Sequence, residues 1–410
     1  MDSLSDLERV HPAIPPSVLL KADLIFRGLQ PDRALAAAGQ GAMPHFRRLE
    51  IDGAVRPIPY FLHLPDGAGG ELLALVRPDS ASPFRLDAKA GGGFALVRDG
   101  VTACDARPHP KPEWYAWAEA QGLRRATAGM NQHGDMLVAN LTPACEYWPA
   151  PGEEASHRCL FCGYGAVSER SECLGQTRGD PAVRAATLDE FGRVLPRSRG
   201  DTRHLYLVGG SMRDRDAEGR RYLQLTQAAV AAEPSYRGAI GCGSQALPVA
   251  WSRRIRDAGA GYACFNLEVW DAELWQRICP GKARFVGREQ WLQDMTDAVG
   301  VFGRGAVLSA FVAGAELVPP AGLPAARALE SNAAGADWLL ARGIVPIHSP
   351  LSPALTSEYG RAAAPDMDYF LHLNLETWRL RRKHGLPLDG RFVCSGCLYA
   401  QIEADLDRLA

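Results

Sequence analysis

The chain has 410 residues, a length that fits two or three domains, or one large α/β domain with additions. Apolar residues make up 47% and charged residues 22%, which is typical of a protein with a substantial buried core. The net charge of −2 gives no overall positive field, so the composition argues against nucleic acid or an anionic membrane surface as a partner.

The first segment, residues 1–44, is rich in Ala and Leu and is expected to be helical. Its beginning has neither the basic start nor the apolar run of a signal peptide. The most apolar stretch, residues 298–320, is interrupted by Arg304 and Glu316 and is too broken to span a bilayer. We therefore expect a cytoplasmic protein.

Residues 45–125 are predicted to form a β-rich accessory region and a linker. Short apolar runs there are bounded by turn residues such as Asp52-Gly53 and Asp99-Gly100. The runs predicted as strands are residues 46–51, 60–64, 72–76 and 94–97.

Residues 126–385 are predicted to form the core of the protein, an α/β domain. Six short apolar runs alternate there with helical stretches, and each run is continuous, as in parallel strands covered on both faces. The runs are residues 136–141, 205–208, 239–242, 263–267, 307–312 and 344–347. Right-handed crossovers between such units generate a partial (β/α)6 barrel of the TIM type. A short C-terminal extension, residues 386–410, follows.

Ten cysteines are too few for a disulfide scaffold in a chain of this length. Five of them fall into two groups, and such spacing in a cytosolic protein indicates metal binding. The groups are Cys145 with Cys159-Leu160-Phe161-Cys162, and Cys394-Ser395-Gly396-Cys397. The first group follows the first barrel strand, at the strand end where reactive groups collect in β/α barrels. Three thiolates there can hold three irons of a [4Fe–4S] cluster and leave the fourth iron open.

A strand, a cysteine and then Cys-x-aromatic-Cys, with Phe161 as the aromatic residue, resembles the signature of the radical S-adenosylmethionine (SAM) superfamily. The resemblance covers roughly residues 130–385. It implies a [4Fe–4S] cluster on Cys145, Cys159 and Cys162 that cleaves SAM reductively to methionine and a 5′-deoxyadenosyl radical. That radical abstracts hydrogen from a bound substrate, expected to be a small molecule. An external electron donor, such as a flavodoxin or ferredoxin, is implied as well.

Three further segments are similar to SAM-binding segments of the family. Val208-Gly209-Gly210-Ser211 is similar to its Gly-Gly-Glu segment, and Phe265-Asn266-Leu267-Glu268 to a strand end of the biotin synthase and lipoyl synthase branch. Phe311-Val312-Ala313-Gly314 is similar to the strand that packs on the adenine. The resemblance implies SAM contacts at Phe161, Gly209, Gly210, Ser211, Asn266, Glu268, Ser309 and Val312, with no catalytic residue assigned.

Two departures from the family pattern leave the subfamily unassigned. Thirteen residues separate Cys145 from Cys159, where the family usually has three, and Ser211 replaces its Glu. One alternative is a non-catalytic zinc protein in which His157 or Cys173 completes a tetrahedral site. Another is an enzyme that modifies RNA or a peptide presented by the β-rich region.

The C-terminal pair, Cys394 and Cys397, has three alternatives. The pair could belong to a second iron–sulfur cluster, form a zinc or redox pair, or remain unligated. A second cluster needs further ligands, for which Cys104, Cys173 and Cys279 are the candidates.

Overall fold

The computed structural model describes residues 4–44, 48–149, 156–163, 173–175, 182–320, 322–353, 356–363, 365–388 and 397–410. The chain divides into two compact units. The first comprises Met1–Ala116, Gln132–Asp135 and Leu388–Ala410, and the second Trp117–Asn131 and Met136–Pro387. Within the described ranges, no helix combines the length and apolar character that a membrane crossing requires.

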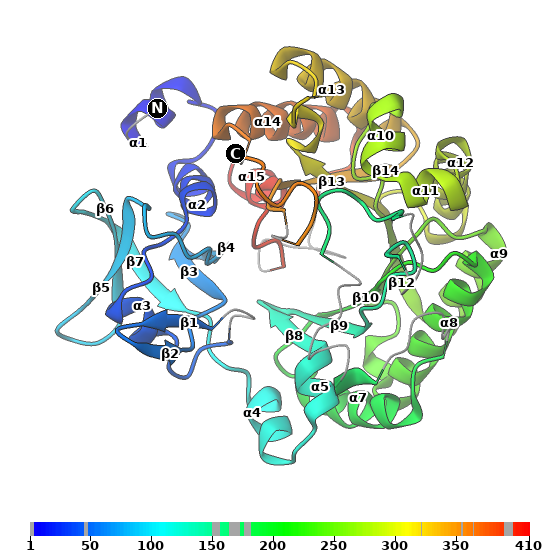
Figure 1. Ribbon diagram of the computed structural model, residues 1–410, viewed down its shortest axis with the longest axis horizontal. Helices are drawn as coiled ribbons and strands as arrows, with labels where there is room; N and C mark the ends of the chain where they lie inside the picture. Colours follow the sequence, from blue (N-terminus) through cyan, green and yellow to red (C-terminus); the bar gives the residue numbers. More distant parts are fainter. Residues whose placement is uncertain are drawn as a thin grey trace. The chain divides into compact units, whose positions relative to one another are not determined.

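The second unit is built on a curled sheet of parallel strands with helices on its outer side (Figure 1). In spatial order the strands are β14 (Ile344–Pro350), β13 (Val307–Ala313), β12 (Ala260–Phe265), β11 (Ile240–Ser244), β10 (His204–Gly209) and β9 (Met136–Thr142). A short strand, β8 (Met130–His133), lies beside β9 at the edge. Neighbours from β9 to β14 pair in parallel. The predicted partial (β/α)6 barrel is confirmed.

The helices of this unit follow the strands in the order that the sequence predicts. They are α5 (Arg124–Gly129), α7 (Ala185–Ser198), α8 (Arg215–Ala232), α9 (Val249–Ala258), α10 (Ala272–Ile278), α11 (Pro280–Phe285), α12 (Arg288–Phe302), α13 (Ala325–Ala341) and α14 (Met367–His384), with α4 (Glu113–Ala120) at the unit boundary and short 3-10 turns at Pro234–Tyr236 and Ala315–Leu317. Pro248 precedes α9 and Gly259 caps its end, as expected from the helix preferences of these residues.

The inner face of the curled sheet is occupied by aromatic side chains in its middle. Cys242 of β11 packs against α8, so the alternation of the strand turns Gly241 and Gly243 to the inner face. A Cβ on Gly241 would lie 2.0 Å from the ring of Tyr262, and one on Gly243 would lie 2.2 Å from the Tyr206 hydroxyl. The two tyrosine rings are parallel, 6.5 Å apart. Space for ligands is therefore expected toward the carboxyl ends of the strands.

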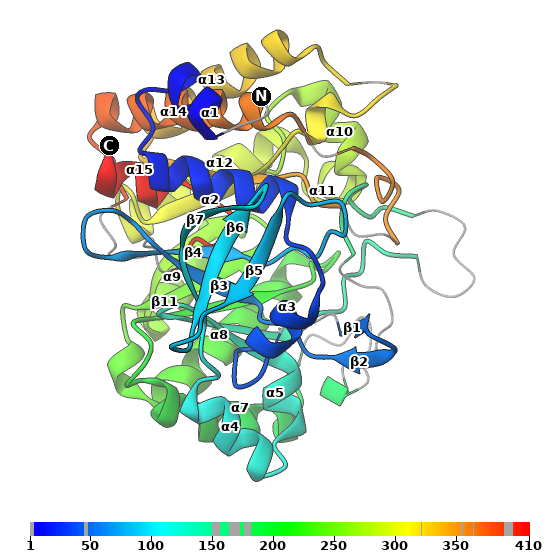
Figure 2. The ribbon, with the colours of Figure 1, turned by 90° about the vertical axis from the view of Figure 1, so that its left-hand side faces the viewer.

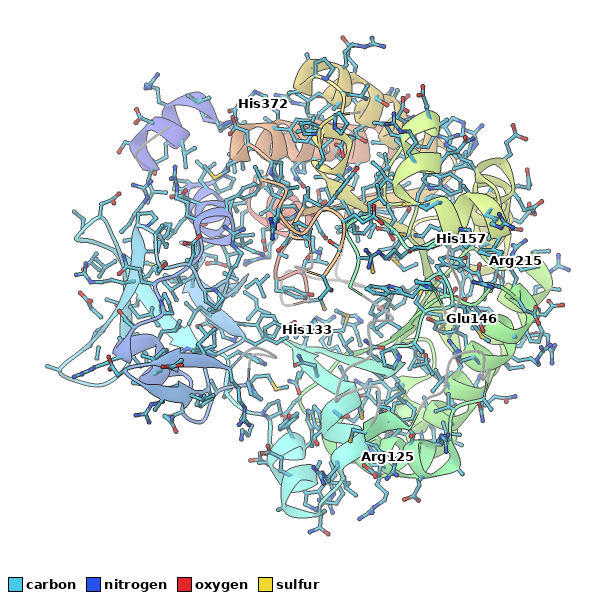
Figure 3. The ribbon with its side chains drawn as sticks, viewed as in Figure 1. Arg125, His133, Glu146, His157, Arg215 and His372 are labelled. Carbon is cyan, nitrogen blue, oxygen red and sulfur yellow. The ribbon has the colours of Figure 1, made fainter. Side chains whose placement is uncertain are left out.

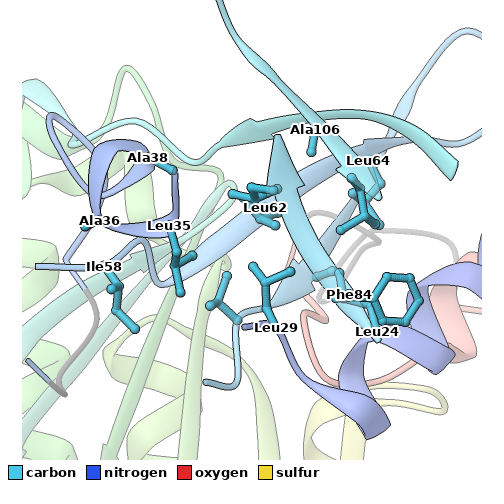
Figure 4. Close-up of a cluster of buried hydrophobic side chains, with 14 of the residues drawn as sticks. Leu24, Leu29, Leu35, Ala36, Ala38, Ile58, Leu62, Leu64, Phe84 and Ala106 are labelled. Atoms are coloured by element: carbon cyan, nitrogen blue, oxygen red, sulfur yellow. The ribbon is translucent and has the colours of Figure 1, made fainter. Parts of the chain in front are cut away.

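The first unit contains the N-terminal helices, an antiparallel sheet and the C-terminal helix (Figure 2). The helices are α1 (Leu4–Val10), α2 (Pro16–Arg27), α3 (Arg33–Ala38) and α15 (Glu403–Leu409). The five-stranded sheet runs β4 (Glu71–Leu75), β3 (Phe61–Pro65), β7 (Val101–Pro108), β6 (Phe94–Arg98), β5 (Phe84–Ala88), and β1 (Leu49–Ile51) pairs with β2 (Ala54–Arg56). Leu24, Leu35, Leu62 and Phe84 share its core (Figure 4).

Helix α15 is fixed to α2 by a buried ion pair. The Lys21 ammonium lies 2.6 Å from the Asp405 carboxylate, both side chains are fully buried, and Lys21 also donates to the Leu398 carbonyl at 2.7 Å. Removing one member of such a pair leaves a charge in a medium that solvates it poorly.

We expect Lys21→Met to lower the free energy of unfolding by about 3–5 kcal/mol, because it strands the Asp405 carboxylate. The double variant Lys21→Met/Asp405→Leu should recover most of that loss, since it removes both buried charges. Urea unfolding followed by circular dichroism measures both effects. A single variant as stable as the unmodified chain would contradict this account of the pair.

Candidate functional site

The cysteine loop, residues 143–163, leaves the carboxyl end of β9 and is anchored at its start to the end of β10. The Gly210 N–H donates to the Thr142 carbonyl at 2.8 Å, and the Glu146 N–H donates to the Ser211 carbonyl at 2.9 Å. Glu146 in turn accepts the Arg213 N–H on its carboxylate at 2.6 Å. Figure 3 shows Glu146 and His157 on this loop. Cys145, Cys159 and Cys162 are all half-buried.

The two predicted SAM-binding glycines lie directly against this loop. A Cβ on Gly209 would lie 2.3 Å from the Thr142 hydroxyl, and one on Gly210 would lie 2.3 Å from the Ala144 carbonyl oxygen and 2.6 Å from the Cys145 nitrogen. No L side chain fits in such spaces unless the backbone moves. The Gly210 carbonyl already accepts from the buried Arg221 guanidinium at 3.1 Å. The glycines therefore bring the strand end and the first cysteine together.

We expect Gly210→Ala to displace the loop, lower the iron bound per chain and cost roughly 1–3 kcal/mol of stability, as overpacking of a filled site does. Gly200→Ala is the matched control, because a Cβ there meets nothing within 4 Å. Iron analysis and thermal unfolding of both variants measure the effect. Equal iron content in the two variants would contradict the role given to Gly210.

The surroundings of Cys145 and Cys159 differ. Burial raises the pKa of the Cys145 thiol to about 11, while N–H groups of Tyr147 and Ser211 point at its sulfur and act in the opposite direction. At Cys159, the S–H of Cys279 donates to the sulfur and, with the nearby positive charge of Lys282, lowers the pKa, although burial acts in the opposite direction. Both sulfurs thus receive donors that favour the thiolate, the form that binds metal.

The second part of the loop is held by α10, α11 and the segment after β14. The Leu160 N–H donates to the Ile278 carbonyl at 2.9 Å, and the Leu160 carbonyl accepts the Tyr359 N–H at 2.8 Å. Gly281 packs so closely on Tyr147 that a Cβ would lie 2.5 Å from the ring. Cys159 and Cys162 are thereby fixed beside residues far away in the sequence.

The segment after β12 brings Asn266 and Glu268 to the same edge of the sheet. The Lys282 ammonium of α11 donates to the Asn266 carbonyl at 2.5 Å and to the Glu268 carboxylate at 2.7 Å. Burial disfavours the charge on Lys282, but Glu268 and Cys159 outweigh it and raise the pKa of the ammonium. No sequence pattern indicated Lys282, because it lies on a six-residue helix and reaches the site only through the fold.

Glu268 has a backbone φ of 74°, in the left-handed region that residues other than glycine rarely adopt. Two hydrogen bonds to β13 hold Glu268 in this conformation. Its N–H donates to the Ala310 carbonyl at 3.0 Å, and its carbonyl accepts the Val312 N–H at 2.9 Å. Such strain persists where the surroundings enforce it and is concentrated at functional sites.

The other residues predicted to contact SAM differ in how deeply they are buried. Ser309 is fully buried, and its hydroxyl accepts the Leu267 N–H at 3.0 Å, so it positions the end of β12. Phe161, Ser211 and Val312 are half-buried. Val312 lies on the same face of β13 as Ala310, whose N–H donates to the Asn266 side chain at 3.2 Å.

A buried polar network supports the loop from behind. The Glu218 carboxylate of α8 accepts the Met212 N–H at 2.7 Å and the Gln245 N–H at 2.8 Å. Gln245 in turn accepts the Tyr147 hydroxyl at 3.1 Å. Burial raises the pKa of Glu218. The network joins the ends of β10 and β11 to the cysteine loop through groups that all have partners.

No protein-family model matches the chain, and no curated protein matches its sequence. Solved structures do align with it. A radical SAM methyltransferase from Sphaerobacter thermophilus aligns over 97% of both chains, with 14% identity and a TM-score of 0.42. The FeFe-hydrogenase maturase HydG from Carboxydothermus hydrogenoformans aligns over 61% of this chain, with 15% identity and a TM-score of 0.41. Coproporphyrinogen III oxidase (HemN) from Escherichia coli, a radical SAM enzyme, aligns over 56%, with 14% identity and a TM-score of 0.36.

The chain is similar to radical SAM enzymes. It spans about half of the other two neighbours' length, 52% of HydG and 50% of HemN.

The C-terminal cysteines are only partly described. Cys394 lies outside the described residues. Cys397 is buried, and its thiol donates to the Asp135 carboxylate at 3.0 Å. Of the cysteines that could complete a second site, Cys173 donates to the Arg124 carbonyl at 3.3 Å and Cys279 lies beside Cys159. A second cluster therefore stays a prediction.

Proposed function

We propose that this protein is a radical SAM enzyme whose [4Fe–4S] cluster is held by Cys145, Cys159 and Cys162. The observation that carries the proposal is the position of the three cysteines: they lie on one loop beyond the carboxyl end of β9, and hydrogen bonds join that loop to the end of β10 and to α10. Three sulfur ligands there leave one iron of the cluster for the amino and carboxylate groups of SAM.

The residues of the site fit a [4Fe–4S] cluster and SAM. The Cys145 sulfur receives two backbone N–H groups and the Cys159 sulfur receives the Cys279 S–H, an arrangement that suits anionic sulfur. Gly209 and Gly210 have no room for a Cβ, which keeps β10 against the loop. When bound, the cluster and SAM would supply a 5′-deoxyadenosyl radical that abstracts hydrogen from the substrate.

The chain's own residues orient and shield the reactants. Lys282 fixes the Glu268 carboxylate and the Asn266 carbonyl, which face the edge where SAM would lie, and Phe161, Ser211 and Val312 would complete its contacts. Tyr206 and Tyr262 fill the middle of the inner face of the curled sheet, so they would exclude water on the side of the site that faces the middle of the sheet. In such a site fixed dipoles replace solvent around the reacting groups.

The substrate is proposed to be a small molecule, and the electron is proposed to come from a flavodoxin or ferredoxin. The reaction class stays undetermined. The nine cysteines that the structure describes form no disulfide bond with one another, which suits the reducing cytoplasm in which we propose that the enzyme works.

Anaerobic reconstitution with iron and sulfide, followed by dithionite and SAM, tests the proposal. We expect formation of 5′-deoxyadenosine that depends on all three components and is absent from Cys159→Ala. A reconstituted protein that holds a cluster but forms neither 5′-deoxyadenosine nor methionine would contradict it.

One observation favours a second candidate, a structural zinc site. Cys279 is close enough to Cys159 to donate its S–H, so a fourth thiolate is at hand for a closed tetrahedral site. Cys279→Ala separates the two candidates. A zinc site would lose its metal in that variant, whereas a cluster on three cysteines would keep its iron.

A further inference from the structure

A pocket lies at the carboxyl ends of β13 and β14, on the edge of the sheet that carries the cysteine loop. It has a volume of about 690 Å³, within the range of small-molecule sites. It is lined by Gly314, directly after β13, and on one side by residues 358–363 and 365–366, which follow β14. Since parallel strands end together, the pocket opens beside the proposed SAM site.

Hydrogen bonds connect this wall to the cysteine loop. Tyr359 lines the pocket, and its N–H donates to the carbonyl of Leu160, which stands between Cys159 and Cys162. Arg158 of the same loop donates to the Thr356 carbonyl at 3.2 Å. A molecule in the pocket would therefore lie next to the loop that carries the proposed cluster.

Two charged groups of the pocket have no ion pair within the ranges that the structure describes. Arg361 is exposed and makes no hydrogen bond within those ranges. Asp366 uses its carboxylate only to accept the Asp368 N–H at 3.0 Å, as the N-cap of α14. The third, Glu358, faces Arg158 at 3.7 Å. A ligand thus meets one positive and one negative charge without a counter-charge.

The rest of the lining is mostly apolar. Leu317, Val318, Ala362 and Pro365 contribute hydrocarbon surface to the same pocket. Buried hydrocarbon supplies the non-directional part of affinity, and the few polar groups fix orientation.

We infer that the substrate is a zwitterion with an apolar body, with an acidic group on Arg361 and an ammonium group on Asp366. The inference rests on the proposed function, because it takes this pocket as the substrate site of the radical reaction. An amino acid with an apolar side chain has this chemistry. A purely anionic ligand would leave the Asp366 carboxylate without a counter-charge, and a purely cationic ligand would leave the Arg361 guanidinium without one.

Three probes with similar hydrocarbon chains test the inference: 2-aminooctanoate, octanoate and octylamine. Equilibrium dialysis is done with the full chain, both before and after iron loading. We expect 2-aminooctanoate to bind about 5- to 10-fold more tightly than either of the others, since each charged contact is worth a few-fold at an exposed site. Because probe binding needs no cluster, a failure here is distinct from a failure to form 5′-deoxyadenosine.

Two variants assign the charges. Arg361→Gln should weaken 2-aminooctanoate to the level of octylamine, and Asp366→Asn, which can still cap α14, should weaken it to the level of octanoate. Arg327→Gln, at an exposed position of α13, is the control and should change nothing. Equal binding of the three probes, no binding at all, or a preference that survives both variants would overturn the inference.

Discussion

Replacing Cys145, Cys159 or Cys162 with Ala is expected to remove nearly all iron from the anaerobically reconstituted protein. Loss of one thiolate removes most of the protein's affinity for the cluster. The iron that has lost its ligand is then open to attack by water or oxygen. Iron and sulfide per chain, with the visible absorption of the cluster, measure the loss. All three variants should remain folded, since none of the cysteines is a large core residue.

Cys242→Ala is the matched control for these variants. Cys242 belongs to the same unit and is buried, but it faces α8 on the outer side of the sheet. Its variant should keep the iron of the unmodified chain. If Cys242→Ala lost iron while Cys162→Ala kept it, the ligand assignment would be wrong.

Replacing Lys282 with Met is expected to weaken SAM binding about 10- to 100-fold while the cluster remains. The ammonium makes two hydrogen bonds, to Asn266 and Glu268, and a hydrogen bond to a charged group is worth about 1.5–3 kcal/mol. Without it, Glu268 repels the SAM carboxylate and loses its orientation. Calorimetric titration of the iron-loaded variant with SAM measures the change.

Lys282→Arg keeps the positive charge and serves as the comparison. It should bind SAM more tightly than Lys282→Met, although the larger guanidinium disturbs the packing above the Trp291 ring, 4.8 Å from the ammonium. Unchanged affinity in Lys282→Met would show that Glu268 and Asn266 do not contact SAM through this arrangement.

The barrel could be predicted from the sequence because its strands are continuous apolar runs. All six predicted runs match observed strands to within three residues at either end. Strand β12 begins earlier than predicted and ends at Phe265, before Asn266. The strand ends early because the left-handed backbone of Glu268 turns the chain. Its start was missed because Gly261, next to Tyr262, interrupts the apolar pattern. In the first unit, β5 and β7 were not predicted from the sequence. Arg85 and Asp87 interrupt the apolar pattern of β5, and Asp105 interrupts that of β7.

The sequence places the three cysteines on one loop after a strand end, because that loop is local in the chain. That they hold a cluster stays a prediction. Lys282, Cys279 and Tyr359 were missed as members of the site, since each reaches it through tertiary packing of α11 or of the segment after β14. Ser309 was predicted to contact SAM from its place near a strand end, and that contact stays a prediction. Its hydroxyl accepts the Leu267 N–H, which positions the end of β12.

The most direct measurement is the electron paramagnetic resonance spectrum of the dithionite-reduced, reconstituted protein before and after addition of SAM. Three sulfur ligands with one vacant iron predict about four irons per chain and a signal that changes when SAM occupies that iron. A protein that takes up a single zinc instead of iron, or whose iron signal is the same with and without SAM, would contradict the account.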